Sequence, residues 1–163
     1  METKNLKINF LGDSITEGVG TSGKDKIYHA LLKEELGLAE ARNYGISGTR
    51  FALQKGTPHR PKNDYVDVNS FSERFAQMDD DADVVVVFGG TNDYGHGDAP
   101  IGGFSDRTPD TFYGACHYLF SGLIKNISES PSSLSLLCTE SVSSIIPAEA
   151  KKMEWQPSGN MLI

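Results

Sequence analysis

The first apolar segment of the chain alternates with polar residues and predicts a short β-strand over residues 6–11. The strand ends in the turn Gly12-Asp13-Ser14, and a glycine-rich stretch and a helical pattern follow it. Ligands of parallel α/β sheets bind at the carboxyl ends of the strands, so Ser14 is well placed for chemistry. Serine and aspartate are also common turn residues, which leaves a purely structural role open at this point.

The clearest strand signal is the run Val84-Val85-Val86-Val87-Phe88. Four consecutive valines and a phenylalanine are typical of a strand that is buried on both faces, as in a parallel sheet covered by helices. A short strand is predicted near residues 42–44, and another over residues 133–138. The pattern therefore indicates the α/β class with a parallel sheet.

Helical patterns separate these strands. Apolar residues that include Leu31 recur on one face over residues 25–36, and Gly37 can end that helix. A second helix is predicted from Ser70 or Ser72 to about residue 78. The third begins with Thr108 as its N-cap and continues to about residue 124. Residues 50–69 and 94–107 are predicted to be loops.

Three strands thus lead into polar turns that contain glycine, at residues 12–14, 45–48 and 90–93. Right-handed helical crossovers bring the carboxyl ends of parallel strands to one edge of the sheet, so we expect the three turns to converge. A serine hydroxyl beside preorganised N–H donors is the arrangement that acyl transfer requires. The Ser14 N–H, a glycine N–H of the second turn and the Asn92 carboxamide are the candidate donors.

These turns resemble the first three sequence blocks of the SGNH (GDSL) hydrolases. The matching segments are Gly12-Asp13-Ser14-Ile15-Thr16, Asn43-Tyr44-Gly45-Ile46-Ser47-Gly48 and Gly90-Thr91-Asn92-Asp93. The resemblance implies a three-layer α/β/α, flavodoxin-like fold with central strand order 2-1-3. It implies Ser14 as the nucleophile, with the Gly48 N–H and the Asn92 side chain as oxyanion donors. It also implies hydrolysis of small, lipid or carbohydrate esters through an acyl-enzyme, without a metal or other cofactor.

The chain departs from the family at its general base. The family carries an Asp-x-x-His block near its C-terminus, and no histidine follows Lys125 here. His96 is the alternative base, because Asp93-Tyr94-Gly95-His96 has the same spacing, although its backbone is tied to the Asn92 turn. We interpret His29 and His117, which lie within predicted helices, as structural or surface residues, and Asp13 as a residue that orders its turn. His59 lies in the long loop, where the sequence shows no partner for it.

The composition changes after Lys125. Residues 1–125 carry the resemblance, whereas residues 126–163 are rich in serine and show little periodicity. This break suggests that a frameshift or truncation has replaced the last third of an SGNH hydrolase. The sheet would then be incomplete on its C-terminal side and prone to self-association. The alternative function is accordingly an SGNH-fold protein whose catalysis is impaired because it lacks its base.

The bulk composition excludes several kinds of partner. A formal net charge of −7 argues against nucleic acid as the main partner, because phosphate binding needs a basic face. No apolar stretch is long enough to span a bilayer, and the first residues lack the apolar core of a signal peptide. The 2 cysteines, Cys116 and Cys138, lack CxxC spacing, so we expect a reduced, cytoplasmic protein without a zinc site.

Two other interpretations, a dinucleotide-binding site and a metal site, depend on short motifs. Residues 18–23 match the dinucleotide-binding pattern G-x-G-x-x-G, but the Asp-Ser turn separates them from the strand, and Asn43-Tyr44 stands where an acidic ribose ligand is needed. His96 and Asp98 are candidate metal ligands, but two such residues in a glycine-rich loop do not complete a site.

Overall fold

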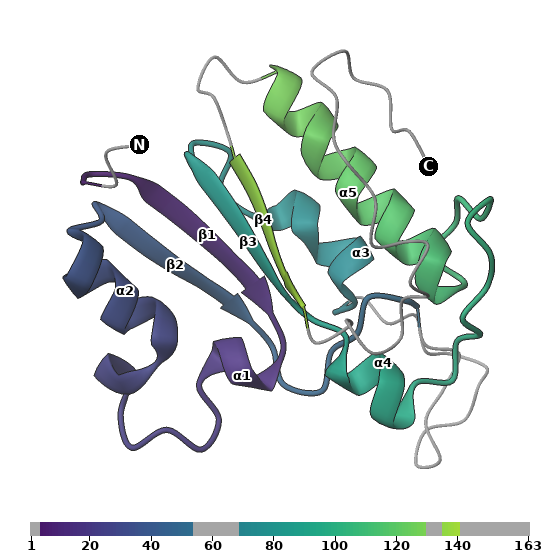
Figure 1. Cartoon of the computed structure of the whole chain (residues 1–163), viewed down its shortest axis with the longest axis horizontal. Helices are drawn as coiled ribbons and strands as arrows, with labels where there is room; N and C mark the ends of the chain where they lie inside the picture. Colours follow the sequence, from purple (N-terminus) through teal and green to yellow (C-terminus); the bar gives the residue numbers. More distant parts are fainter. Residues whose placement is uncertain (1–3, 54–68, 130–134, 141–163) are drawn as a thin grey trace.

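The computed structural model describes residues 4–53, 69–129 and 135–140. In this part of the chain, four parallel strands form one sheet in the order β2-β1-β3-β4 (Figure 1). The strands are β1 (Lys7–Gly12), β2 (Glu40–Gly45), β3 (Val84–Gly89) and β4 (Ser135–Glu140). The central order 2-1-3 is confirmed, and β4 begins two residues after the strand predicted over residues 133–138.

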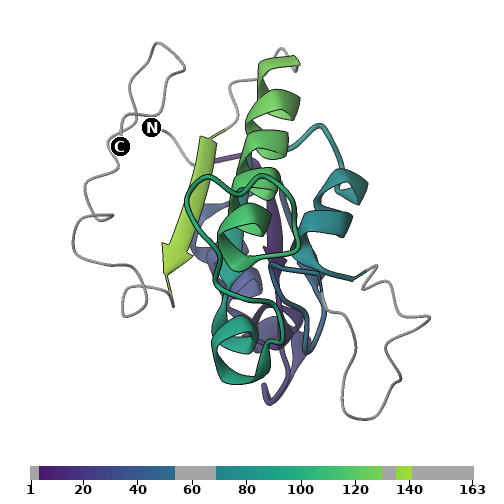
Figure 2. The same ribbon diagram turned by 90° about the vertical axis from the view of Figure 1, so that its right-hand side faces the viewer.

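Helices cover both faces of the sheet, so the predicted three-layer α/β/α fold is confirmed (Figures 1 and 2). On one side lies α2 (Tyr28–Leu36), preceded by the one-turn helix α1 (Ser14–Glu17) and the 3₁₀ helix η1 (Lys24–Lys26). On the other side lie α3 (Phe71–Arg74), the 3₁₀ helix η2 (Phe75–Gln77) and α5 (Phe112–Glu129). The short α4 (Thr91–His96) follows β3. None of the helices described is both long enough and apolar enough to cross a membrane.

Alternate residues of the central strands enter two separate apolar cores. Leu11, Val85 and Val87 pack on the α5 side against a cluster that includes Leu119. On the α2 side the cluster consists of Ile8, Phe10, Leu38 and Val86, with Leu32 and Leu36 packed against it. Because both faces of the sheet are covered, the polar residue Asn9 of β1 is buried as well. Its side chain donates to the Asp79 carbonyl at 2.7 Å.

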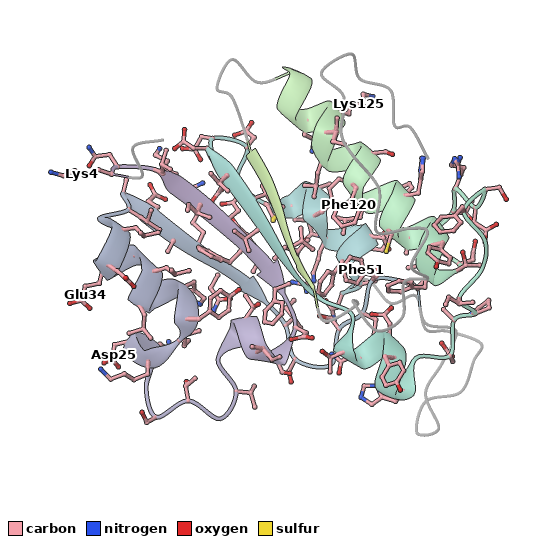
Figure 3. The ribbon with its side chains drawn as sticks, viewed as in Figure 1. Lys4, Asp25, Glu34, Phe51, Phe120 and Lys125 are labelled. Carbon is pink, nitrogen blue, oxygen red and sulfur yellow. The ribbon has the colours of Figure 1, made fainter. Side chains whose placement is uncertain are left out.

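The loop after β2 contributes aromatic side chains to the α5 core. Phe51 is buried, and its ring centroid lies 4.7 Å from that of Phe71 and 6.3 Å from that of Phe120 (Figure 3). In contrast, Asp25 and Glu34 are exposed and extend outward from the α2 side of the molecule (Figure 3). The start of the segment predicted as the loop 50–69 is therefore part of the core; residues 54–68 lie outside the described residues.

Three local predictions were wrong. Residues 91–96 form α4, so helix replaces the first part of the loop predicted at 94–107. The last helix begins at Phe112 rather than near Thr108, because the Thr111 hydroxyl accepts the Gly114 N–H at 3.1 Å and serves as the cap. Leu31 is exposed, so the apolar face of α2 is narrower than its spacing predicted.

Two glycines allow α1 to pack directly on the ends of β1 and β2. A Cβ atom at Gly12 would overlap the side chain of Thr16, and one at Gly45 would overlap the backbone of Thr16 and Glu17. Thr16 itself is fully buried, and its hydroxyl lies 3.0 Å from the Tyr28 hydroxyl. The position of Ser14 at the start of α1 therefore depends on the missing side chains at these two glycines.

We expect Gly45→Ala to destabilise the protein by about 1–3 kcal/mol, because the new methyl group meets backbone that cannot rotate away. Gly95→Ala is the matched control, since it lies within α4 and a Cβ there would meet nothing within 4 Å. Alanine favours helix, so this control should be neutral or up to about 1 kcal/mol more stable. Urea unfolding measures both variants, and equal midpoints would contradict the packing of α1 on β2.

Candidate active site

The three predicted turns lie at the carboxyl edge of the sheet, near α1 and α4 (Figure 1). At the first of them, Ser14 is the first residue of α1 and is half-buried. Asp13 is the N-cap: it is buried, and its Oδ1 accepts the Ile15 N–H at 3.0 Å. Gly18, at φ 99°, ends this single turn of helix. The Asp13 carboxylate therefore orders the turn that presents Ser14.

The second turn is fixed to the first by main-chain and side-chain bonds. Ile46 N donates to the Gly12 carbonyl at 3.1 Å, and Ser47 N donates to Glu17 Oε2 at 2.6 Å. Gly48 is exposed and adopts φ 76°, a left-handed conformation that favours glycine. In the described part of the chain, the N–H groups of Ser14 and Gly48 have no hydrogen-bond acceptor, so both are free to bind a ligand oxygen.

The third turn carries the side chain that joins the other two. Asn92, in the first turn of α4, donates from Nδ2 to the Thr49 carbonyl at 2.9 Å. The same nitrogen lies 3.5 Å from Asp13 Oδ2, at the outer limit of a hydrogen bond. Since Asp13 precedes Ser14 and Thr49 follows Gly48, the structure brings Ser14, Gly48 and Asn92 together.

Asp93 holds α4 against the segment that follows the second turn. Its carboxylate accepts the Phe51 N–H at 3.0 Å and the Ala52 N–H at 3.2 Å. Burial raises the pKa of Asp93 to about 6, although these two backbone N–H groups and the charge of Arg50 act in the opposite direction. This carboxyl group therefore titrates well above the range of an exposed aspartate.

His96, the last residue of α4, contacts its own helix and Arg50. Its Nδ1 lies 3.0 Å from the Asn92 carbonyl oxygen and 3.3 Å from Nη2 of Arg50. Arginine can only donate, so Nδ1 either accepts from Arg50 or donates to the carbonyl, depending on the tautomer. Among the described residues, no histidine nitrogen is hydrogen-bonded to the Ser14 hydroxyl.

The other histidines either form no hydrogen bond to the Ser14 hydroxyl or lie outside the described residues; His29 contacts the backbone of Thr16 in α1. His29 is buried in α2, with its ring centroid 5.5 Å from that of Phe10. His117 lies on α5, where its Nδ1 is 3.4 Å from the Ser121 hydroxyl. His59 belongs to the segment that the structure does not describe. The general base thus has no candidate in contact with Ser14 in residues 4–53, 69–129 or 135–140.

Sequence reasoning missed two residues beneath the site. Thr49 is buried and accepts the Asn92 amide on its carbonyl, and Arg74 is buried and donates to the Thr49 hydroxyl at 2.9 Å. Thr49 directly follows the Gly48 turn, which is a signal that could have found it. Arg74 lies in a short helix 25 residues further along, and nothing in its local sequence distinguishes it from a solvated helix residue.

The two motif-based alternatives are not supported by the local structure. The glycine loop at residues 18–23 follows α1 rather than β1, and it leads into a 3₁₀ helix, so it does not form the strand–turn–helix unit of a dinucleotide site. Among the residues that the structure describes, no group of three His, Cys, Asp or Glu side chains could hold a metal ion, so His96 and Asp98 gain no third ligand there.

Comparison with known proteins establishes the family. The model of the GDSL-like lipase/acylhydrolase family matches residues 10–151, and the chain therefore belongs to this family. The match continues past Lys125 into the serine-rich segment. No match is found among curated proteins.

Solved structures share the fold. A protein from Lactobacillus plantarum is 31% identical, with a TM-score of 0.61, over 83% of this chain and 57% of its own. A second structure, also 31% identical, has a TM-score of 0.65, and the chain covers 58% of it. A GDSL-like lipase candidate from Bacteroides uniformis is 22% identical with a TM-score of 0.64, over 84% of this chain and 72% of its own. The chain thus spans less than two thirds of the length of the first two structures.

The raised pKa of Asp93 predicts a specific dependence of stability on pH. Between the ordinary value of 3.8 and about 6, the folded protein binds more protons at Asp93 than the unfolded chain does. The free energy of unfolding should therefore fall as pH rises through this window, by on the order of 2–3 kcal/mol for this group. Below pH 3.8 the contribution is fully present.

Urea unfolding of wild type and Asp93→Asn at several pH values isolates this contribution. The variant cannot titrate at residue 93, so the free energy of unfolding of the wild type minus that of the variant should decrease steadily from pH 4 to pH 6.5. Burial lowers the pKa of His29, which acts in the opposite direction near the upper end of this range, but it is common to both proteins and cancels. A difference that is constant with pH would contradict the prediction.

Proposed function

We propose that this chain is a serine-dependent acylhydrolase that cleaves carboxylic esters through an acyl-enzyme at Ser14. The observation that supports the proposal is that three donors lie at one edge of the sheet. They are the N–H groups of Ser14 and Gly48, which have no acceptor among the described residues, and the Asn92 amide. Such donors stabilise the oxyanion of a tetrahedral intermediate, and the loss of one typically costs about 2.7–4 kcal/mol. Family membership agrees with this chemistry.

In the proposed reaction, Ser14 Oγ attacks the ester carbonyl carbon and forms a new C–O bond. The carbonyl oxygen becomes an oxyanion and accepts hydrogen bonds from the two main-chain N–H groups and from one Asn92 amide proton. That proton leaves its long contact with Asp13, while the other stays on the Thr49 carbonyl. The intermediate then collapses, the alcohol leaves with the proton that Ser14 has lost, and the acyl group remains on Oγ. Water attacks the same carbonyl carbon, and the carboxylic acid departs as Ser14 recovers its proton.

Exposed apolar side chains next to the turns, and a cavity on α4 that is not lined by Ser14, Gly48 or Asn92, suggest a small ester with an apolar substituent. Ile15 and Ile46, which follow Ser14 and Gly45 in the chain, expose their side chains. A cavity of about 190 Å³ lies beside α4, and its lining includes Tyr94, Ala99 and Phe112. We infer that a short acyl or alkoxy group occupies this region, in an acetylated carbohydrate or another small ester.

Replacement of the nucleophile tests the proposal. Wild type should react with a fluorophosphonate probe and release p-nitrophenol from p-nitrophenyl acetate, whereas Ser14→Ala should do neither above the uncatalysed background. Ser22→Ala, which changes an exposed loop serine, is the matched control and should behave as wild type. Equal reactivity of wild type and Ser14→Ala would show that Ser14 is not the nucleophile.

A second candidate function is an impaired acylhydrolase that acylates but releases its acyl group slowly. It is favoured by the orientation of His96 and by the absence of any hydrogen bond to the Ser14 hydroxyl within the described part of the chain. Nitrophenolate is a good leaving group. Acylation of Ser14 by a nitrophenyl ester therefore needs a general base less than acylation by an alkyl ester does. Deacylation still requires that water be deprotonated.

The two candidates differ in their response to added imidazole. Without a base, p-nitrophenol release should show a burst equivalent to the Ser14 content, followed by a slow phase that imidazole accelerates. Ser14→Ala at the same imidazole concentration supplies the blank for direct hydrolysis of the ester. A fast steady state that imidazole does not change would indicate that the protein already has a base, and would exclude the impaired enzyme.

A further inference from the structure

Arg74 lies outside every motif of the site, yet its guanidinium is buried directly beneath it. Only 6% of the residue is exposed. Nη2 donates to the Gly12 carbonyl at 2.5 Å and to the Thr49 hydroxyl at 2.9 Å, and Nη1 donates to the Tyr44 carbonyl. Nε donates to the Asn69 carbonyl at 2.8 Å. One side chain therefore contacts the ends of β1 and β2 and the turn that contains Gly48.

The Thr49 hydroxyl links Arg74 to the turn that contains Gly48. It donates to the Ile46 carbonyl at 2.7 Å while it accepts from Arg74, which uses its one proton and one of its lone pairs. Thr49 N also donates to the Ile46 carbonyl, at 3.3 Å. Gly48 lies inside this closed turn, and the Asn92 amide is bonded to the Thr49 carbonyl on its other side.

We propose that Arg74 is a positioning residue that, through the Thr49 hydroxyl, fixes the direction of the Gly48 N–H toward the reacting carbonyl. The inference rests on the proposed function. Oxyanion donors act only within about 2.7–3.1 Å of the developing charge, so a small rotation of the turn weakens them. The planar guanidinium fork holds several acceptors in fixed directions, which a lysine ammonium cannot do. A buried charged donor also forms stronger hydrogen bonds than a neutral one does.

The chain contains a matched turn without this support. At residues 18–21 a glycine with φ 85° precedes Thr21, whose hydroxyl donates to the Gly18 carbonyl at 2.7 Å and whose N–H donates to the same oxygen at 3.1 Å. The Thr49 turn has the same local pattern, but it additionally receives Arg74 and Asn92. Thr21 is exposed and lies outside the candidate machinery. Thr21→Val thus removes a hydroxyl from a similar turn but leaves the Arg74–Thr49 contact and the Gly48 N–H unchanged.

The test measures kcat and KM for p-nitrophenyl acetate and the second-order rate of fluorophosphonate labelling. Thr49→Val and Arg74→Lys should each lower kcat and the labelling rate roughly tenfold, with KM nearly unchanged, because the loss affects the transition state rather than substrate binding. Thr49→Ser, which keeps the hydroxyl, should restore most of the rate. The Thr49→Val/Arg74→Lys double variant should be no slower than the slower single variant, because both changes remove the same hydrogen bond between Arg74 and Thr49.

A purely structural role gives a different result. Thr49→Val and Arg74→Lys would then lower the urea midpoint but label at the wild-type rate, and the inference would be overturned. Thr21→Val as slow as Thr49→Val would overturn it as well. If wild type is not labelled at all, the proposed function fails instead.

A readout that does not depend on activity still decides the inference in that case. Amide hydrogen exchange, followed by NMR, reports how tightly the 46–49 turn is closed. Arg74→Lys should accelerate exchange of the Thr49 N–H several-fold and shift the Gly48 resonance, while the Thr21 N–H keeps its wild-type exchange rate. Unchanged exchange at Thr49 would show that Arg74 does not hold this turn.

Discussion

The hydrogen bond from the Asn92 carboxamide to the Thr49 carbonyl is the contact on which the carboxyl edge of the sheet depends. It joins α4 to the turn after β2, and the same nitrogen reaches Asp13 at the start of α1. Asp13 and Thr49 are buried, so their polar groups are costly to leave without partners. Most of the arrangement that suits acyl transfer therefore follows from satisfying buried polar groups.

The two edges of the sheet use polar side chains in different ways. At the amino ends of the strands, Lys7 and Arg42 form exposed ion pairs with Asp81, at 2.6 and 2.5 Å, and these cations hold the pKa of Asp81 well below its usual range. Exposed pairs of this kind contribute little to stability. At the carboxyl ends, Arg74 is buried and its donors are directed at main-chain carbonyls. Buried polar contacts with the main chain are thus found at the edge where the candidate chemistry lies.

The sequence predicted the strands and the convergence of three turns, because burial on both faces and the spacing of glycines leave clear local patterns. The central strand order was implied by the resemblance to the SGNH hydrolases, not by these patterns. It missed what depends on distant contacts. Arg74 resembles a solvated residue of a short helix until β1 and β2 are placed above it. The helix α4 was missed because Gly95, a poor helix former, lies within it and its apolar residues are few. The orientation of His96 follows from its carbonyl contact in α4, which spacing alone does not reveal.

The groups proposed as oxyanion donors are held by contacts of the fold, and no comparable contact holds a histidine against Ser14 among the described residues. The positions of Gly48 and Asn92 are set by hydrogen bonds that also hold the fold together, so they persist as long as the sheet and its turns do. A histidine that served only as a base would not be needed to hold the fold together. His96 contacts the Asn92 carbonyl of its own helix. Members of a catalytic triad act as a unit, but binding and the oxyanion hole retain part of the rate without them. The groups proposed as oxyanion donors are therefore held in place by the fold itself, whereas no histidine among the described residues is bonded to the Ser14 hydroxyl.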